Sequence, residues 1–397
     1  MPKQPSFPEF VSLIAMMTAI IALAIDAMLP ALPNIGQDLG VQRENNSQLV
    51  ISTLFLGLAL GQLIFGPLSD SAGRKPPIFI GFALFIVGCL MSLFAPNFAT
   101  MLAGRFLQGL GVSAPRSVSL ALVRDLYEGD KMAEVMSYVM TVFILVPMIA
   151  PAYGQFIMGL ASWRAIFTSF IILAVLTSLW FALRQGETLS KDKRRPFSFK
   201  QIYSASKEII STRAALGYTL AAGFISGAFL GYLNSAQQIF QDQYKLGNLF
   251  PLYFAIISLS LGAASFINAR LVTRYGMKRL ATTSLNVMTL FSVAGFIIAL
   301  IQAGNPPLWQ FMIYLLLTFF CVGILFGNLN ALAMQPLGHI AGIGAAIVGA
   351  LSTFISIPLG TWIGLSFNNT ILPLIAGLAI LGAISVGVVW WVQNDSK

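Results

Sequence analysis

Twelve long apolar stretches with few charges follow one another along this 397-residue chain. A helix that crosses the apolar core of a bilayer, about 30 Å thick, needs about 20 such residues. The recurrence of these stretches predicts an all-α membrane protein with twelve transmembrane helices. The expected spans are approximately residues 10–32, 48–68, 77–95, 99–122, 132–159, 164–184, 214–238, 250–270, 280–303, 307–331, 342–366 and 370–392.

The composition is that of a chain whose main solvent is lipid. Only 9% of the residues are charged and 57% are hydrophobic, whereas a soluble domain carries roughly 25% charged residues. The first apolar run has no basic region before it and no small-residue cleavage site after it, so we interpret it as a span and not as a signal peptide. Cys89 and Cys321 both lie in apolar spans, where we expect neither a disulfide framework nor a metal site.

The net charge of the chain is +9, and the positions of its Lys and Arg residues indicate how the chain is oriented in the membrane. Cytoplasmic loops of membrane proteins are enriched in Lys and Arg, which predicts that both termini of this chain lie in the cytoplasm. We expect a multi-pass protein of a bacterial inner membrane, with the lipid bilayer and no nucleic acid as its partner. Of the 23 basic residues, two then lie within helices and three on outer loops, namely Arg43, Arg164 and Lys245.

One long polar segment, residues 185–213, separates six spans from six. We therefore predict an N-terminal six-helix bundle at 1–184, a cytoplasmic linker at 185–213 and a C-terminal six-helix bundle at 214–397. The basic residues of this segment could bind nucleic acid, but a linker close to anionic lipid headgroups is the simpler interpretation.

The two predicted halves repeat a short loop pattern. Residues 66–75 read GPLSDSAGRK, and residues 269–278 read ARLVTRYGMK. Repeated halves related by an axis along the membrane normal are one architecture that places a substrate site at the midplane between them. Three pairs of residues match at the same offset: Leu68 with Leu271, Gly73 with Gly276, and Lys75 with Lys278.

Several motifs resemble those of the major facilitator superfamily. Residues 66–75 resemble its signature loop between helices 2 and 3, and RFLQGLG at 105–111 resembles its helix 4 motif. APAYG at 150–154 resembles the helix 5 motif of its antiporters, although Gln155 stands where a second glycine is common. Three further stretches are similar to the Bcr/CflA branch of twelve-span drug:proton antiporters, namely residues 26–39, 123–130 and 336–346.

This resemblance covers essentially the whole chain and implies a pseudo-symmetric fold of two six-helix bundles. It further implies drug:proton antiport by alternating access, with protons as the coupling ion and no other cofactor. We expect small amphipathic drugs as substrates and a monomer as the functional unit. A proton-coupled exporter of a metabolite, sugar or siderophore on the same fold is the alternative.

Three ionisable residues lie within spans and away from their ends: Asp26, Arg105 and Arg116. A charge at the bilayer centre costs on the order of 2.5–3.5 kcal/mol on insertion scales, so each is a functional hypothesis. Asp26 and Arg105 lie at similar depths. We predict that Asp26 binds a proton or substrate, and a permanent ion pair with Arg105 that orients the helices is the alternative.

The two arginines are eleven residues apart, close to three helical turns, and so are expected to share a face as a basic stripe. Arg116 could meet a polar group of the substrate or extend its long stem to the membrane interface. The family resemblance implies a role for Arg105 in proton coupling, and a structural anchor is the alternative.

The loop after the second span carries the predicted gating residues Gly66, Asp70, Gly73 and Arg74. The resemblance implies a latch in which Asp70 faces the start of helix 11 near Gly342 and Arg74 pairs with Asp125. A loop that only satisfies topology is the alternative. In helix 5, two prolines remove backbone donors and indicate a bend or hinge, so the gating set also includes Pro147, Pro151 and Gly154.

Uncharged polar residues within the other spans could line a drug pocket or join helices by hydrogen bonds. We predict that several contact substrate together with Asp26 and Arg116. His339 is expected in a loop, and Gly57 and Gly61 are expected to allow close helix packing. The predicted pocket residues are Tyr138, Tyr218, Tyr232, Asn234, Gln237, Tyr253 and Asn330, with Gln238 and Asn328 as further polar candidates.

The sequence also argues against other classes of protein. No G-x-x-x-x-G-K-[ST] motif is present, so ATP is not expected as the energy source. An enzyme would need a convergent set of His, Ser, Cys or carboxylate groups at the midplane, and the only histidine is expected in a loop. A sensor or scaffold without transport activity would not need an intramembrane carboxylate.

Overall fold

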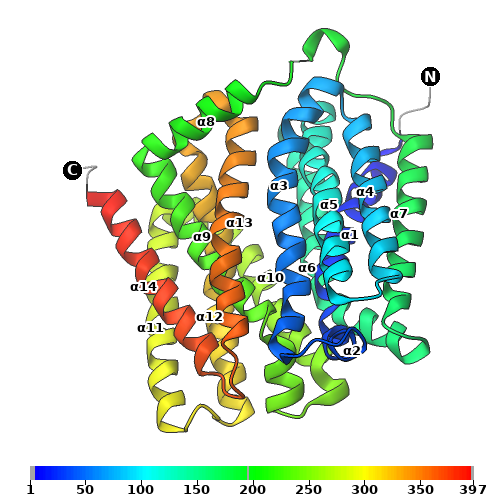
Figure 1. Cartoon of the computed structure of the whole chain (residues 1–397). Helices are drawn as coiled ribbons and strands as arrows, with labels where there is room; N and C mark the ends of the chain where they lie inside the picture. Colours follow the sequence, from blue (N-terminus) through cyan, green and yellow to red (C-terminus); the bar gives the residue numbers. More distant parts are fainter. Residues whose placement is uncertain (1–4, 195, 395–397) are drawn as a thin grey trace. The chain divides into compact units, whose positions relative to one another are not determined.

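The computed structural model describes residues 5–194 and 196–394, so Arg195 of the linker lies outside the described residues. Helices account for nearly all of the regular structure in this part of the chain, and twelve of them have 19 residues or more, which confirms the predicted architecture (Figure 1). The long helices are α1 (Phe7–Asp26), α3 (Leu49–Ala72), α4 (Lys75–Leu93), α5 (Phe98–Leu126), α6 (Gly129–Leu160), α7 (Arg164–Arg184), α9 (Arg213–Leu233), α10 (Phe250–Tyr275), α11 (Met277–Ile301), α12 (Leu308–Met334), α13 (Ala341–Leu365) and α14 (Leu372–Asn394).

Two shorter α-helices complete this set, α2 (Leu32–Asp38) and α8 (Phe199–Ser211). Ten described segments have the length and hydropathy of membrane spans, and one of these, Leu308–Leu365, contains both α12 and α13. The remaining long helix, α5, includes Arg105 and Arg116, which lower its hydropathy. Several long helices extend beyond the predicted apolar runs because a helix can continue past the lipid core.

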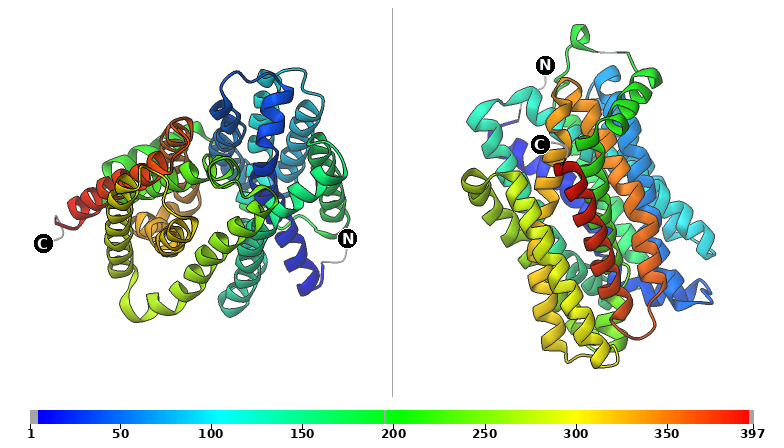
Figure 2. Two further views of the ribbon diagram at one scale, coloured as in Figure 1. Left: turned by 90° about the horizontal axis from the view of Figure 1, so that it is seen from below. Right: turned by 90° about the vertical axis from the view of Figure 1, so that its left-hand side faces the viewer.

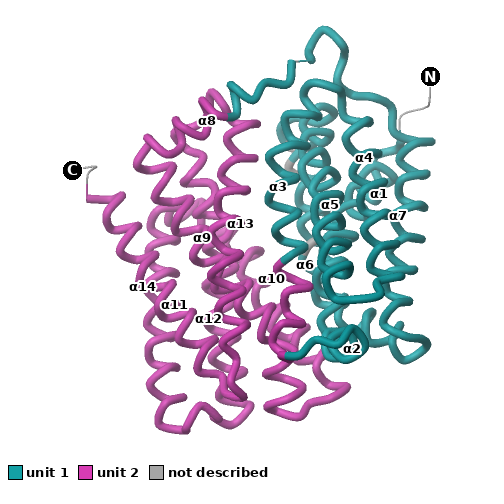
Figure 3. The backbone as a smooth tube through the Cα atoms, in the orientation of Figure 1, with its two compact units in different colours: residues 1–42, 53–202 teal, residues 43–52, 203–397 magenta. Residues whose placement is uncertain are grey.

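The chain divides into two compact units, shown in different colours in Figure 3: unit 1 holds residues 1–42 and 53–202, and unit 2 holds residues 43–52 and 203–397. The short segment 43–52 therefore belongs to unit 2, although residues on both sides of it belong to unit 1. In unit 1, α4 packs against α5 and α7, and α1 packs against α6. In unit 2, α9 packs against α13 and α14, and α12 packs against α10 and α11. Figure 2 shows the helices from two further directions.

The close packing expected at the two glycines of α3 is confirmed. A Cβ atom at Gly57 would lie 2.0 Å from the backbone oxygen of Phe106 in α5, and one at Gly61 would lie 2.0 Å from Oγ of Ser113. Because lipid gives helices little hydrophobic reason to associate, such close backbone approach is a main source of helix affinity in membranes. These glycines therefore fix the distance between α3 and α5.

We expect Gly57→Ala to destabilise the protein by about 1–3 kcal/mol, the usual cost of overpacking a filled contact. The obstructing atom is backbone and cannot rotate away. Thermal unfolding of the detergent-purified protein measures the effect. Gly159→Ala in α6 is the control, because nothing lies within 4 Å of the added Cβ there. Equal melting temperatures for the two variants would contradict the close packing.

Candidate functional site

Among the described charged side chains of unit 1, Arg105 is the most deeply buried, with 0% of its surface exposed. Its Nη1 donates to Oε1 of Gln108 at 2.6 Å, and its Nη2 donates to the carbonyl oxygen of Ala24 at 2.7 Å. Gln108 in turn donates from Nε2 to the carbonyl oxygen of Gly88 at 3.0 Å and to Oγ of Ser92 at 2.9 Å. The guanidinium thus joins α5 to α1 directly and to α4 through Gln108.

Asp26 is the last residue of α1, two positions beyond the carbonyl that Arg105 contacts, and is 6% exposed. Among the described residues, no ion pair within 4.0 Å joins the carboxylate of Asp26 to Arg105. The permanent Asp26–Arg105 ion pair considered from the sequence is therefore not formed in this structure. Amide and carbonyl dipoles contact the guanidinium instead, and a role of Asp26 in proton exchange stays a prediction.

The environment of Asp26 depends on the helix 5 motif, which lies in α6. A Cβ atom at Gly154 would lie 1.9 Å from the carbonyl oxygen of Ala27, the residue directly after Asp26. Pro147 and Pro151 both lie inside α6, which continues as one helix from Gly129 to Leu160. The glycine therefore brings the α6 backbone against the end of α1, while a hinge at the prolines stays a prediction.

Arg116 lies in a different environment from Arg105. Its side chain is exposed, whereas Arg105 is fully buried on the same helix. The two arginines therefore differ in exposure, while the predicted basic stripe on one face of α5 stays a prediction. Similar angular positions three turns apart do not give equal burial, because the neighbouring helices cover the two levels differently.

The loop between α3 and α4 is held by Arg74, whose side chain is 7% exposed. Its Nε donates to Oδ2 of Asp125 at 2.8 Å, so the Arg74–Asp125 pairing implied by the family resemblance is confirmed. Its Nη1 donates to Oδ1 of Asp70 at 2.6 Å and to Oγ of Ser69 at 2.8 Å. Burial alone would lower the pKa of Arg74, but the two carboxylates raise it above its ordinary value, so the latch keeps its positive charge.

The turn itself is shorter than expected from the sequence. Gly66 and Asp70 lie within the last turns of α3, which ends at Ala72, and α4 begins at Lys75. The expected contact between Asp70 and the start of helix 11 near Gly342 joins residues of different units and stays a prediction. Only Gly73 and Arg74 form the connection between the helices.

Glu187 is a part of this latch that sequence reasoning missed. Its Oε1 accepts a hydrogen bond from the backbone N–H of Arg74 at 2.8 Å, and its Oε2 accepts one from that of Lys75 at 3.1 Å. These N–H groups begin α4, where a carboxylate is favoured by the positive end of the helix dipole. Gly73 has φ +99°, and a Cβ atom there would lie 2.6 Å from Oε2 of Glu187. Glycine is thus required both by the backbone conformation and by the space that the carboxylate occupies.

In unit 2, three predicted pocket residues at the end of α9 hydrogen-bond to the segment 43–52. Nδ2 of Asn234 donates to Oγ of Ser52 at 2.9 Å, and Oγ1 of Thr361 donates to the same oxygen at 2.8 Å. These are interhelical bonds of the kind considered as the alternative to substrate binding. Further bonds in this polar cluster join Gln48 to Gln237, Gln238 to Asn45, and Asn45 to the carbonyls of Leu365 and Phe367.

Two predicted pocket tyrosines belong to an aromatic cluster in unit 2. Tyr232 stacks on Phe254 with ring centroids 5.8 Å apart, and Tyr253 stacks on Phe240 at 6.2 Å. Phe250 contacts both phenylalanines and so connects the two stacks. Aromatic rings packed in this way provide an apolar wall of fixed shape.

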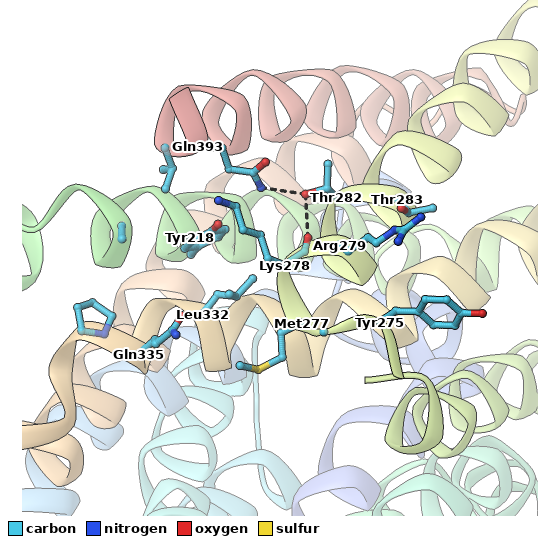
Figure 4. A pocket seen from close by; sticks show the side chains of 14 residues that line it. Tyr218, Tyr275, Met277, Lys278, Arg279, Thr282, Thr283, Leu332, Gln335 and Gln393 are labelled. Carbon is cyan, nitrogen blue, oxygen red and sulfur yellow. Dashed lines mark hydrogen bonds between the residues drawn. The ribbon is translucent and has the colours of Figure 1, made fainter. Parts of the chain in front are cut away.

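The other predicted pocket residues are not brought to this cluster. Tyr138 lies on α6 in unit 1 and is 51% exposed, and Asn330 donates to the carbonyl of Phe326 in its own helix. Tyr218 lies fourteen residues before Tyr232 on α9, roughly 20 Å along the helix axis. It lines a separate cavity of about 860 Å³ at the beginning of α9 (Figure 4).

Comparison with known proteins identifies relatives along nearly the whole chain. A family model described as Major Facilitator Superfamily matches residues 14–361. The chain is 31% identical over 382 residues to an uncharacterized MFS-type transporter, YdgK, of Bacillus subtilis (strain 168), with 94% of this chain and 93% of the relative covered. It is 28% identical over 393 residues to a bicyclomycin resistance protein homolog of Haemophilus influenzae, with 97% and 96% covered.

The fold is also similar to that of solved structures. The xylose transporter XylE from E. coli, in a partially occluded inward open conformation, matches with a TM-score of 0.73 at 12% identity. The match covers 97% of each chain. At this identity the similarity concerns the fold alone.

We expect Glu187→Ala to destabilise unit 1 by about 1–3 kcal/mol, because hydrogen bonds from backbone N–H groups to a charged carboxylate are lost. Thermal unfolding of the purified protein measures the loss. Glu134→Ala is the control, since Glu134 forms only an exposed ion pair with Lys131, and such pairs contribute about 0–1 kcal/mol. Equal melting temperatures for Glu187→Ala and the control would show that the hydrogen bonds of Glu187 to the start of α4 do not stabilise the protein.

Proposed function

Because the chain belongs to the major facilitator superfamily, we propose that this membrane transporter exports drugs from a bacterial cell in exchange for protons. The name of the Haemophilus influenzae relative, a bicyclomycin resistance protein homolog, supports drugs as the substrate class. Both termini lie in the cytoplasm in this proposal, as the distribution of Lys and Arg indicates.

The observation that carries the proposal is the position of Asp26. The residue is buried at the end of α1, and no ion pair with Arg105 neutralises it in the described structure. An ionised carboxylate at membrane depth is costly, and either a bound proton or a cationic or hydrogen-bonding substrate removes that cost. Proton and drug then compete for one group, which is the minimal requirement for exchange.

Arg105 positions this group. Its hydrogen bond to the carbonyl of Ala24 holds the end of α1. Gly154 allows α6 to pack against Ala27, which directly follows Asp26. A change in the protonation of Asp26 therefore acts on a site where three helices, α1, α5 and α6, meet. The latch at Arg74 holds the far end of α5 through Asp125 and controls, in this proposal, how readily the transporter changes conformation.

We expect Asp26→Asn to abolish drug accumulation driven by the proton gradient. One proton carries about 2.3 kcal/mol per 100 mV, which sustains a concentration ratio of about 50 for an uncharged drug exchanged one for one. The ratio for the variant is expected to fall to about 1. Uptake of a labelled drug by inverted vesicles, with and without an uncoupler, measures it.

The control for this experiment is Glu134→Gln, which removes an exposed carboxylate on α6 and should keep the full ratio. Uncoupler-sensitive accumulation by Asp26→Asn would contradict a proton site at Asp26. Absence of any uncoupler effect on the unaltered protein would contradict antiport itself. Accumulation of a labelled metabolite in place of every drug tested would favour the alternative exporter.

We expect Asp70→Asn to leave the protein folded and inserted but to slow transport by about tenfold. The substitution weakens a charge-assisted hydrogen bond to Arg74 that contributes on the order of 1.5 kcal/mol. Initial rates of drug uptake, normalised to the amount of inserted protein, measure the effect. An unchanged rate would show that the loop satisfies topology without acting as a latch.

A further inference from the structure

The cavity that Tyr218 lines is not used by the proposed exchange mechanism. It lies entirely in unit 2, at the end where α9 begins, α10 meets α11, and α12 and α14 end. Its volume is about 860 Å³, within the range of small-molecule sites in proteins. Figure 4 shows the side chains that surround it, among them Lys278, Arg279, Thr282 and Gln393.

The cavity carries positive charge that none of the described carboxylates neutralises. Lys278 and Arg279 lie in the first turn of α11 and are exposed. In the described part of the chain, no carboxylate lies within 4.0 Å of either side chain. The N-terminal end of a 25-residue helix adds further partial positive charge at the same place.

Acidic residues are scarce throughout this unit. The sequence of unit 2 holds only four carboxylate side chains, Glu44, Glu208, Asp242 and Asp395, and Asp395 lies outside the described residues. Glu208 contacts His339 at 2.8 Å, and Asp242 receives a hydrogen bond from Gln237. Two further basic residues, Arg270 and Arg274, lie near the end of α10, shortly before the cavity-lining Tyr275 in the sequence.

One part of the cavity wall is polar and another part is apolar. Oγ1 of Thr282 accepts a hydrogen bond from Nε2 of Gln393 at 2.9 Å and donates to the carbonyl of Lys278 at 2.9 Å (Figure 4). Tyr218 and Thr283 also line this region. The apolar part of the wall consists of Met277, Leu332, Pro336 and Val392.

Aromatic residues indicate that this end of unit 2 lies at a membrane surface. Trp390 and Trp391 lie near the end of α14 and are both exposed, and tryptophan is enriched where lipid meets water. The guanidinium of Arg213 lies 4.5 Å from the ring of Trp391 and donates a hydrogen bond to the carbonyl of the same residue. A ligand in this cavity would thus contact positively charged side chains, hydroxyl groups and apolar side chains at the depth of the lipid headgroups.

We propose that this cavity binds the anionic phosphate headgroup of a phospholipid from the cytoplasmic leaflet. Lys278 and Arg279 attract the phosphate, hydroxyl groups of the wall donate to its oxygens, and the apolar part of the wall receives the start of the acyl chains. The choice of leaflet rests on the orientation given under the proposed function. The phosphate chemistry is shared with free phosphate anions, and the experiment separates the two sources.

The test measures binding to the full-length protein purified in detergent, by melting temperature and by native mass spectrometry. Phosphatidylglycerol, phosphatidylcholine and inorganic phosphate are the three ligands. We expect phosphatidylglycerol to bind and stabilise the protein, and the other two to have little effect. K278A/R279A should weaken phosphatidylglycerol binding by roughly thirtyfold, as expected when two basic contacts to an anionic lipid are lost.

Two further variants make the result specific. K191A/K193A removes the same charge from the exposed linker in unit 1 and should change the affinity by less than about twofold. K278R/R279K keeps the charge and should restore binding, which distinguishes a lost site from a misfolded protein. Equal loss in both alanine variants, or equal binding of phosphatidylcholine, would overturn the proposal.

A stabilisation by inorganic phosphate equal to that by phosphatidylglycerol would also overturn it, because the source of the anion would then be soluble. Each of these outcomes concerns binding alone. They are therefore distinguishable from a failure of drug and proton exchange, which is measured by transport in vesicles.

Discussion

A fully buried guanidinium must have partners for its donors, and this requirement organises unit 1. Arg105 reaches a backbone carbonyl of α1 and the amide of Gln108, and Gln108 reaches α4. In a medium of low dielectric these bonds are strong and leaving one unmade is costly. The helices that surround the acidic residue of the first span are therefore held together by a cation that does not form an ion pair with it.

The two units repeat a loop but use it differently. In unit 1, Arg74 and Lys75 lie beside the carboxylates of Asp70, Asp125 and Glu187. In unit 2, the matching loop ends in Lys278 and is followed by Arg279, and the described structure provides no nearby carboxylate for either. One copy is thus closed by contacts within the protein, whereas the other leaves its charge available to a ligand.

The sequence predicted the helices well because the thickness of the bilayer determines the length of an apolar run. It also predicted the pairing of Arg74 with Asp125, because the family resemblance of residues 66–75 implies it. The difference between Arg105 and Arg116 could not be predicted, since helical periodicity gives the direction of a side chain and not what covers it. The role of Glu187 could not be predicted either, because its hydrogen-bond partner Arg74 lies 113 residues away and the polar linker offers many similar residues.

The bond between Glu187 and the start of α4 changes how the linker should be understood. The linker begins at residue 185, and its third residue is already fixed to unit 1. Leu189 is tied to the same carboxylate through its own N–H group. The free length of the tether between the two halves is consequently shorter than the polar segment, because at least its first five residues, 185–189, are held against unit 1.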